Sequence, residues 1–153
     1  MRFGVLGTGP WATGVHLPGL AQHPAAELVG VWGRDAAEAK AVGAEFDVPG
    51  YPDVDALLAD VDAVSIALPP HVQAPLAVRA AEAGRHLLLE KPVALDLAAA
   101  DEVVEAARAA GVASVVFFTD RFQAGTSTWL AQAARTASGT CTSGGRATDR
   151  AST

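Results

Sequence analysis

Residues 2–12 read RFGVLGTGPWA, and this stretch decides the fold. The short apolar run Arg2–Leu6 stops at glycines, and Trp11–Gln22 then has helical character. Between them stands the GxGxxA pattern Gly7-Thr8-Gly9-Pro10-Trp11-Ala12. In such a turn the first glycine permits the bend, the second lets the backbone approach a pyrophosphate, and alanine allows close helix–sheet packing. Free N–H groups at the helix start then favour phosphate. The pattern therefore predicts a dinucleotide site, and the alternative is a tight turn without a ligand.

Four more apolar runs follow, and a helical stretch separates each from the next. The runs are Glu27–Trp32, Ala63–Leu68, His86–Leu89 and Val112–Phe118. The helical stretches are Asp35–Phe46, a short helix capped by Asp53, Gln73–Ala83, and Leu97–Ala110 after the cap Asp96. Continuous apolar strands alternating with helices are typical of a parallel sheet covered on both faces. We therefore predict an α/β fold with a doubly wound parallel sheet. A helical bundle is disfavoured, because short Val- and Ile-rich runs bounded by Gly and Pro make poor helices.

The composition excludes several classes of protein. Of the 153 residues 50% are hydrophobic, which is incompatible with disorder of the whole chain. The net charge of −6 argues against nucleic acid and anionic membranes as partners, and a single cysteine, Cys141, excludes a disulfide scaffold. No leader pattern and no apolar stretch long enough to span a membrane occur, so the sequence predicts a cytoplasmic protein.

The composition changes after Phe122. Of the 30 residues from Ala124 to Thr153, 22 are Ala, Gly, Ser or Thr. We therefore predict a nucleotide-binding domain over residues 1–122 and a largely disordered, low-complexity tail over residues 123–153. Within that tail Trp129–Thr136 has the pattern of one amphipathic helix against the sheet, whereas Ser138–Thr153 has too few apolar side chains to fold.

The end of the second run addresses the choice of dinucleotide. In NAD sites an acidic residue stands here, whereas NADP sites have a small residue and a nearby arginine. The sequence reads Trp32-Gly33-Arg34-Asp35, so Gly33 takes the acidic position and Arg34 follows. This arrangement favours NADP over NAD. In the alternative interpretation Arg34 is merely solvated and Asp35 is only a helix cap.

Two further motifs follow later apolar runs. Leu68-Pro69-Pro70 ends the third run and turns the chain across the carboxyl edge of the sheet, where ligands bind. Glu90-Lys91-Pro92 ends the fourth run and places charges there. An ammonium at this edge can hydrogen-bond a substrate hydroxyl, which makes Lys91 the candidate catalytic residue. The alternative for Glu90 and Lys91 is a salt-bridged strand end. His71 is expected to be a surface residue.

These motifs, in this order, resemble the nucleotide-binding domain of the glucose–fructose oxidoreductase/inositol dehydrogenase (Gfo/Idh/MocA) family over about residues 2–122. The segments that carry the resemblance are GTGPWA, WGRD, DAVSIALPP, AGRHLLLEKPVAL and FFTDRF. The resemblance implies a Rossmann-type NAD(P)-binding domain in which Lys91 is catalytic near the nicotinamide. It further implies that Pro69, Pro70 and Glu90 line the cofactor and that Arg121 lies near the nicotinamide side. Members of the family oxidise or reduce a hydroxyl of a sugar, inositol or related polyol.

The sequence departs from the family pattern in three respects. Leu68 stands where the family has threonine, and Gln73, which can still hydrogen-bond near the cofactor, replaces a histidine. Nothing matches the family's second α/β domain or its Asp-x-x-x-His pair. We therefore expect the substrate domain to be absent, the chain to be truncated or frame-shifted, and the isolated chain to turn over weakly or not at all. A sugar or polyol substrate would require a second domain. The alternatives are a non-catalytic NAD(P)-binding module and an inactive remnant.

Overall fold

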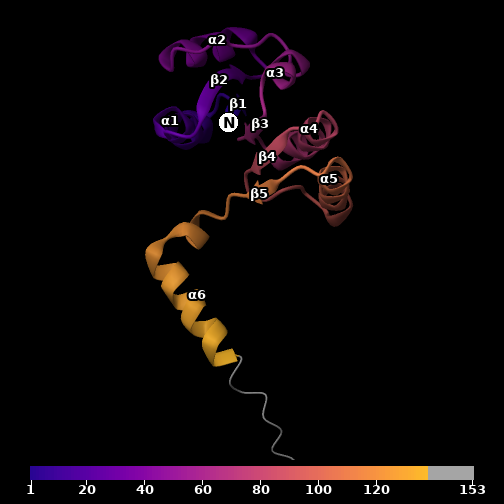
Figure 1. Ribbon diagram of the computed structural model, residues 1–153. Helices are drawn as coiled ribbons and strands as arrows, with labels where there is room; N and C mark the ends of the chain where they lie inside the picture. Colours follow the sequence, from indigo (N-terminus) through magenta and orange to yellow (C-terminus); the bar gives the residue numbers. More distant parts are fainter. Residues whose placement is uncertain (138–153) are drawn as a thin grey trace, which may run out of the picture. The chain divides into compact units, whose positions relative to one another are not determined.

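A five-stranded parallel sheet forms the centre of the first compact unit, Met1–Phe117, in a computed structural model that describes residues 1–137. Its strand order is β2-β1-β3-β4-β5 (Figure 1). The strands are β1 Arg2–Leu6, β2 Glu27–Trp32, β3 Ala63–Ile66, β4 His86–Leu89 and β5 Ser114–Val116. The predicted α/β fold with a parallel sheet is thereby confirmed.

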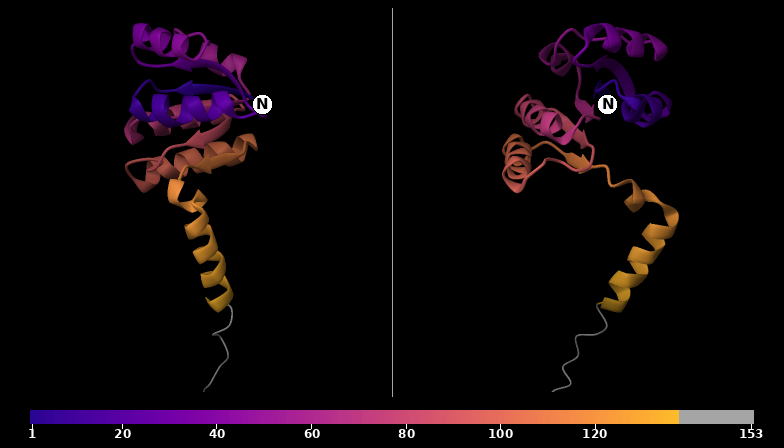
Figure 2. Two further views of the ribbon diagram at one scale, coloured as in Figure 1. Left: turned by 90° about the vertical axis from the view of Figure 1, so that its left-hand side faces the viewer. Right: turned by 180° about the vertical axis from the view of Figure 1, so that it is seen from behind.

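Helices cover both faces of this sheet. They are the π-helical segment η1 Ala12–His16, α1 Leu17–Gln22, α2 Ala36–Glu45, α3 Val54–Asp60, α4 Pro70–Glu82 and α5 Leu97–Ala110. One apolar core joins α3, α4 and α5 to the sheet, and another joins η1, α1 and α2 to it. Figures 1 and 2 accordingly show α1 on one side of the sheet and α4 and α5 on the other. The sheet is therefore doubly wound, as its apolar strands require.

Aspartate side chains start three of the helices at the predicted caps. Asp35 Oδ1 accepts hydrogen bonds from the first turn of α2, at 2.8 Å from Ala37 N. Asp53 and Asp96 each accept a backbone N–H at 2.9 Å at the starts of α3 and α5. Each cap satisfies an N–H group that has no partner within its own helix.

An isolated bridge beside β2 completes the strand order. Gly50 pairs with Val31 in parallel, Val31 N–H donates to Pro49 O at 3.0 Å, and Tyr51 N–H donates to Val31 O at 2.7 Å. Counting this bridge as a rudimentary strand gives the order of the Rossmann fold, in which ligands bind where the order reverses. That reversal lies between β1 and β3, which pair directly.

The boundary between β3 and α4 differs from the sequence prediction. The strand ends at Ile66 rather than Leu68, and the helix starts at Pro70 rather than Gln73. Proline suits the first helical position, because its φ is already helical and its missing N–H would have no partner there. The two prolines therefore act as the helix start and not only as a break.

The second unit, from Phe118 onward, contains two helical segments within the described residues. A 3₁₀ turn spans Thr119–Phe122 and is followed by α6, Ala124–Ala137. The amphipathic helix predicted over Trp129–Thr136 lies inside α6, which begins five residues earlier. Residues 123–153 are predicted to be largely disordered. Within them, the alanines of α6 supply high helix propensity. The expectation for residues 138–153 lies outside the described residues. Within residues 1–137, no helix is long and apolar enough to cross a membrane.

Candidate functional site

The glycine turn after β1 lies where three strands end. Gly7 N–H donates to Trp32 O at 2.8 Å at the end of β2, and Ala67 N–H donates to Leu6 O at 2.9 Å beyond β3. Gly7 has a φ of +136°, and a Cβ on it would lie 2.5 Å from Ala67 O. Only glycine combines that backbone conformation with that close approach.

The second glycine of the motif has no packing reason to be glycine. Gly9 is exposed, and a Cβ on it would meet no protein atom within 4 Å. Residues 10–22 are helical, and Thr13 N–H donates to Gly9 O at 3.0 Å. Ala12 is fully buried against the sheet. The backbone beside Gly9 is thus open to a ligand at a helix start, which fits the role that the motif predicts for a pyrophosphate.

A cavity of about 510 Å³ lies beside the glycine turn at the β2 side. Its lining comprises Thr8, Gly9, Gly33, Arg34, Asp35, Glu38, Ala67, Leu68 and Pro69. Gly33 is buried, and a Cβ on it would lie 2.6 Å from Thr8 Cγ2. An acidic side chain at position 33 would therefore displace Thr8. The exposed Arg34 forms no ion pair with any carboxylate within residues 1–137.

A second cavity, of about 340 Å³, lies toward β4. It is lined by Gly9, Pro10, Trp11, Ala67, Leu68, Pro69, Glu90 and Lys91. Because Gly9, Ala67, Leu68 and Pro69 line both cavities, the two adjoin across the switch point of the sheet. We call the two together the groove.

The structure brings most of the predicted site residues to the groove and leaves others beneath it. Those that line it are Thr8, Gly9, Pro10, Trp11, Gly33, Arg34, Leu68, Pro69, Glu90 and Lys91. Gly7 and Ala12 are buried under it. Pro70 starts α4, and Arg121 belongs to the second unit, so its role stays a prediction.

Gln73 holds the loop after β4. It is fully buried, and its Oε1 accepts from Glu90 N–H at 2.9 Å. Its Nε2 donates to Glu90 O at 2.7 Å and to the carbonyls of Pro92 and Val93 at 3.1 Å each. With both ends of its amide engaged in this way, Gln73 supports the groove from behind instead of lining it.

The carboxylate of Glu90 is the centre of a buried polar network. Its Oε1 accepts from Trp11 Nε1 at 2.5 Å and lies 3.0 Å from His16 Nε2, while its Oε2 accepts from Lys91 N at 3.1 Å. His16 Nδ1 lies 2.6 Å from Ser65 Oγ. The predicted alternative, a salt bridge between Glu90 and Lys91, is not what holds Glu90. Besides Trp11, the side chain that lies within hydrogen-bonding distance of Glu90 Oε1 among the described residues is that of His16.

Lys91 is exposed at the rim of the groove. Its backbone is tied to Glu90, and the peptide bond from Lys91 to Pro92 is cis. His71 is exposed, as predicted for a surface residue.

Sequence reasoning missed His16 and Ser65. His16 lies in a predicted helix and Ser65 inside the apolar run AVSIAL, and neither belongs to a motif. One signal was available. Ser65 is the polar member of a strand predicted to be buried, and a buried hydroxyl requires a hydrogen-bonding partner.

The family described as "Oxidoreductase family, NAD-binding Rossmann fold" (GFO_IDH_MocA) matches residues 1–118. This chain belongs to the Gfo/Idh/MocA family. The resemblance seen in the motifs is confirmed, and the matched part of the chain is an NAD-binding Rossmann domain.

Named relatives of this Gfo/Idh/MocA domain are sugar oxidoreductases. A UDP-N-acetylglucosamine 3-dehydrogenase of Acidithiobacillus ferrooxidans is 44% identical over 107 residues, which are 68% of this chain and 32% of that protein. A dTDP-3,4-didehydro-2,6-dideoxy-alpha-D-glucose 3-reductase of Streptomyces antibioticus is 36% identical over 121 residues, 78% of this chain and 37% of that protein. The chain thus spans about a third of the length of these relatives.

Solved structures of family members superpose on the chain. The A. ferrooxidans dehydrogenase GnnA gives a TM-score of 0.80 at 36% identity, covering 87% of this chain and 43% of that one. KijD10, a 3-ketoreductase from Actinomadura kijaniata in complex with NADP and TDP-benzene, gives 0.80 at 29% identity, covering 88% and 42%.

Proposed function

We propose that this chain binds a nicotinamide dinucleotide in the groove and is the cofactor-binding part of an oxidoreductase that acts on a hydroxyl of a sugar or related polyol. The observation that carries the proposal is the groove itself. It runs from Arg34 past Gly9 to Lys91 across the switch point of the sheet. At its centre the open backbone of Gly9 and the helix start are suited to the pyrophosphate.

The β2 side of the groove supports NADP as the preferred dinucleotide. Residue 33 is glycine, so position 33 offers no carboxylate to an unphosphorylated ribose. Thr8 occupies the space that a side chain at position 33 would need. Asp35, the nearest acid in sequence, is engaged as the cap of α2. The guanidinium of Arg34 is unpaired within residues 1–137 and suits a 2′-phosphate.

The β4 side of the groove supports the catalytic role of Lys91. When bound, the nicotinamide ring accepts or donates the hydride. Lys91 Nζ would hydrogen-bond the reacting hydroxyl of the substrate and take up or return its proton. The buried carboxylate of Glu90 holds the backbone of Lys91 in place at the rim. The two relatives named above, a UDP-N-acetylglucosamine 3-dehydrogenase and a dTDP-sugar 3-reductase, support a sugar as substrate.

Titration of the purified chain with NADPH and NADH, followed by nucleotide fluorescence, tests the proposal. We expect saturable binding of both, with NADPH bound more tightly. Arg34→Ser removes the cation and should weaken NADPH binding about tenfold, the equivalent of about 1.4 kcal/mol, with little effect on NADH. Arg108→Ser, on the exposed surface of α5, is the matched control. Flat curves for both nucleotides would overturn the proposal, and an equal effect of Arg34→Ser on both would overturn the preference for NADP.

A further inference from the structure

His16 lies outside every motif of the groove, yet it contacts the groove through one buried carboxylate. We propose that His16 is a positioning residue: its imidazole, anchored by Ser65, fixes Glu90 and thereby sets the Trp11 indole and the Lys91 backbone at the β4 side of the groove. The contacts that carry this proposal are those of Glu90 with His16, Trp11 and the Lys91 amide. The positioning role of His16 rests on the proposed function only where the affinity for the nucleotide is used as a readout.

The roles of the two imidazole nitrogens follow from their partners. A carboxylate oxygen only accepts hydrogen bonds, so His16 Nε2, 3.0 Å from Glu90 Oε1, carries a hydrogen and donates it. On the other side of the ring, Ser65 Oγ lies 2.6 Å from Nδ1 and can donate its hydroxyl hydrogen there. Since Ser65 lies on β3, the ring is held by the central part of the sheet. This anchoring makes the network directional, from strand to imidazole to carboxylate.

Burial makes the network sensitive to the loss of any member. Ser65 is fully buried, His16 is 4% exposed and Glu90 is 8% exposed. A carboxylate with so little access to water needs its hydrogen-bond donors, because an unpaired buried charge is strongly unfavourable. Without His16, we expect Glu90 to reorient toward water, and Trp11 and the Lys91 amide would lose their acceptor.

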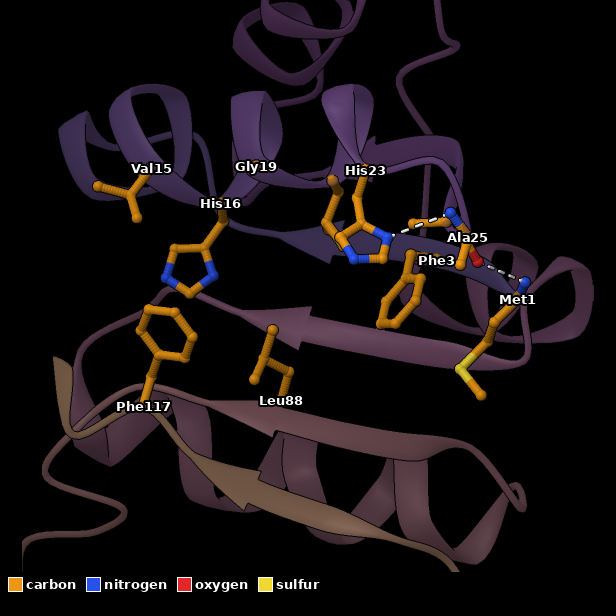
Figure 3. A pocket seen from close by; sticks show the side chains of 11 residues that line it. Met1, Phe3, Val15, His16, Gly19, His23, Ala25, Leu88 and Phe117 are labelled. Atoms are coloured by element: carbon orange, nitrogen blue, oxygen red, sulfur yellow. Dashed lines mark hydrogen bonds between the residues drawn. The ribbon is translucent and has the colours of Figure 1, made fainter. Parts of the chain in front are cut away.

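On its other side the imidazole of His16 packs against apolar groups. The ring faces Phe117, with centroids 5.6 Å apart and planes tilted by 46° (Figure 3). Beyond it lies a cavity of about 580 Å³ whose lining is mostly apolar, with Phe3, Leu20 and Leu88 among its residues. Both ring nitrogens thus have partners among the described residues, and His16 also lines the cavity.

Trp11 is the exposed residue of the groove whose side chain this network restrains. Trp11 is 47% exposed and lines the same cavity as Lys91, so its indole forms part of the groove wall. An indole on the surface samples several rotamers unless a hydrogen bond fixes it. The hydrogen bond to Glu90 is such a restraint, and it preorganises the wall before a ligand arrives.

The experiment compares His16→Leu with His23→Leu in the purified chain. Both histidines line the 580 Å³ cavity, but His23 is exposed, and its Nδ1 accepts a hydrogen bond from Ala25 N–H at 3.2 Å. The first readout is the NMR resonance of the Trp11 indole N–H, assigned by its absence in Trp11→Phe. We expect His16→Leu to move it toward the position of a water-exposed indole and to speed its hydrogen exchange at least tenfold. His23→Leu should leave it in place.

A conservative variant and a second readout separate positioning from stability. The side-chain amide of His16→Gln can donate to Glu90 Oε1, so it should restore the indole resonance largely to its wild-type position. The affinity for NADPH should fall about fivefold in His16→Leu and recover in His16→Gln. If His16→Leu does not fold, Ser65→Ala replaces it, with a smaller shift of the indole resonance expected.

The outcomes distinguish this inference from the proposed function. An indole resonance that does not move in His16→Leu, or in Ser65→Ala where that variant is used, overturns the positioning role. Failure of His16→Gln to restore the resonance overturns it as well. If the wild-type chain binds neither nucleotide, the proposed function fails, whereas the indole resonance still decides the role of His16.

Discussion

The two walls of the groove are built by opposite means. The wall at β1 and β2 is shaped by missing side chains, with Gly7 and Gly33 packed against neighbours that leave no room for a Cβ. The wall at β4 is shaped by buried polar side chains, with Glu90 held by His16 and the loop behind it held by Gln73. Substitutions in the first wall therefore act by adding volume, and those in the second act by leaving polar atoms without partners.

Gly7→Ala should have the largest effect. The added Cβ would lie 2.5 Å from a backbone oxygen, on a residue whose φ is +136°. We expect the free energy of unfolding to fall by about 3 kcal/mol or more, measured by urea denaturation. Gly14→Ala is the matched control, because a Cβ there meets nothing within 4 Å. A Gly7→Ala protein as stable as this control would contradict the steric account of the first wall.

Gln73→Leu tests the second wall in the same assay. The change removes one of the two acceptors of the Glu90 N–H, the other being Ile66 O at 3.3 Å, and leaves the carbonyls of the loop without their side-chain donor. We expect a loss of about 2–3 kcal/mol in the free energy of unfolding. Gln22→Leu, at the exposed end of α1, should change it by less than about 0.5 kcal/mol. Equal stabilities of the two variants would mean that the amide of Gln73 does not hold the loop.

Gly9→Ala separates ligand binding from folding in the first wall. The added Cβ meets no protein atom within 4 Å, so the free energy of unfolding should stay within about 0.5 kcal/mol of wild type. Nucleotide affinity should nevertheless fall about tenfold, because the methyl group occupies space that the pyrophosphate needs. The measurement is the NADPH titration together with urea denaturation. Unchanged affinity would show that the phosphates do not approach Gly9.

Lys91→Ala should have the smallest effect on binding. The side chain is exposed and its backbone contact with Glu90 survives the change. We expect the dissociation constant for NADPH to change less than about twofold, which is under about 0.5 kcal/mol. Lys40→Ala, on α2, controls for the loss of one positive charge. A tenfold loss specific to Lys91→Ala would place the ammonium among the cofactor-binding groups instead of beside the substrate.

Much of the fold and of the first wall could be predicted from local patterns. The apolar runs, the Asp caps and the GxGxxA turn each act over a few residues, so their sequence is sufficient to recognise them. The sequence places the end of β3 two residues too late and the start of α4 three residues too late, because the two prolines are interpreted as ending the strand although Pro70 stands at the first position of α4.

The second wall could be predicted only in part. Glu90 and Lys91 stood out as charges at a strand end, but the partner of Glu90 is 74 residues away in the chain. Gln73 was expected beside the cofactor, whereas its amide is directed at the loop after β4. Hydrogen bonds between segments so far apart depend on the relative placement of three elements, which no local pattern records.

By itself the sequence determined the class of fold, the family and the glycine-shaped wall, because strand periodicity, helix capping and the conformational freedom of glycine are properties of neighbouring residues. Only the tertiary structure decided how Glu90 is held and which side chains face the groove. Burial removes water as a partner for polar groups, so each must find its partner among side chains that the fold alone brings together.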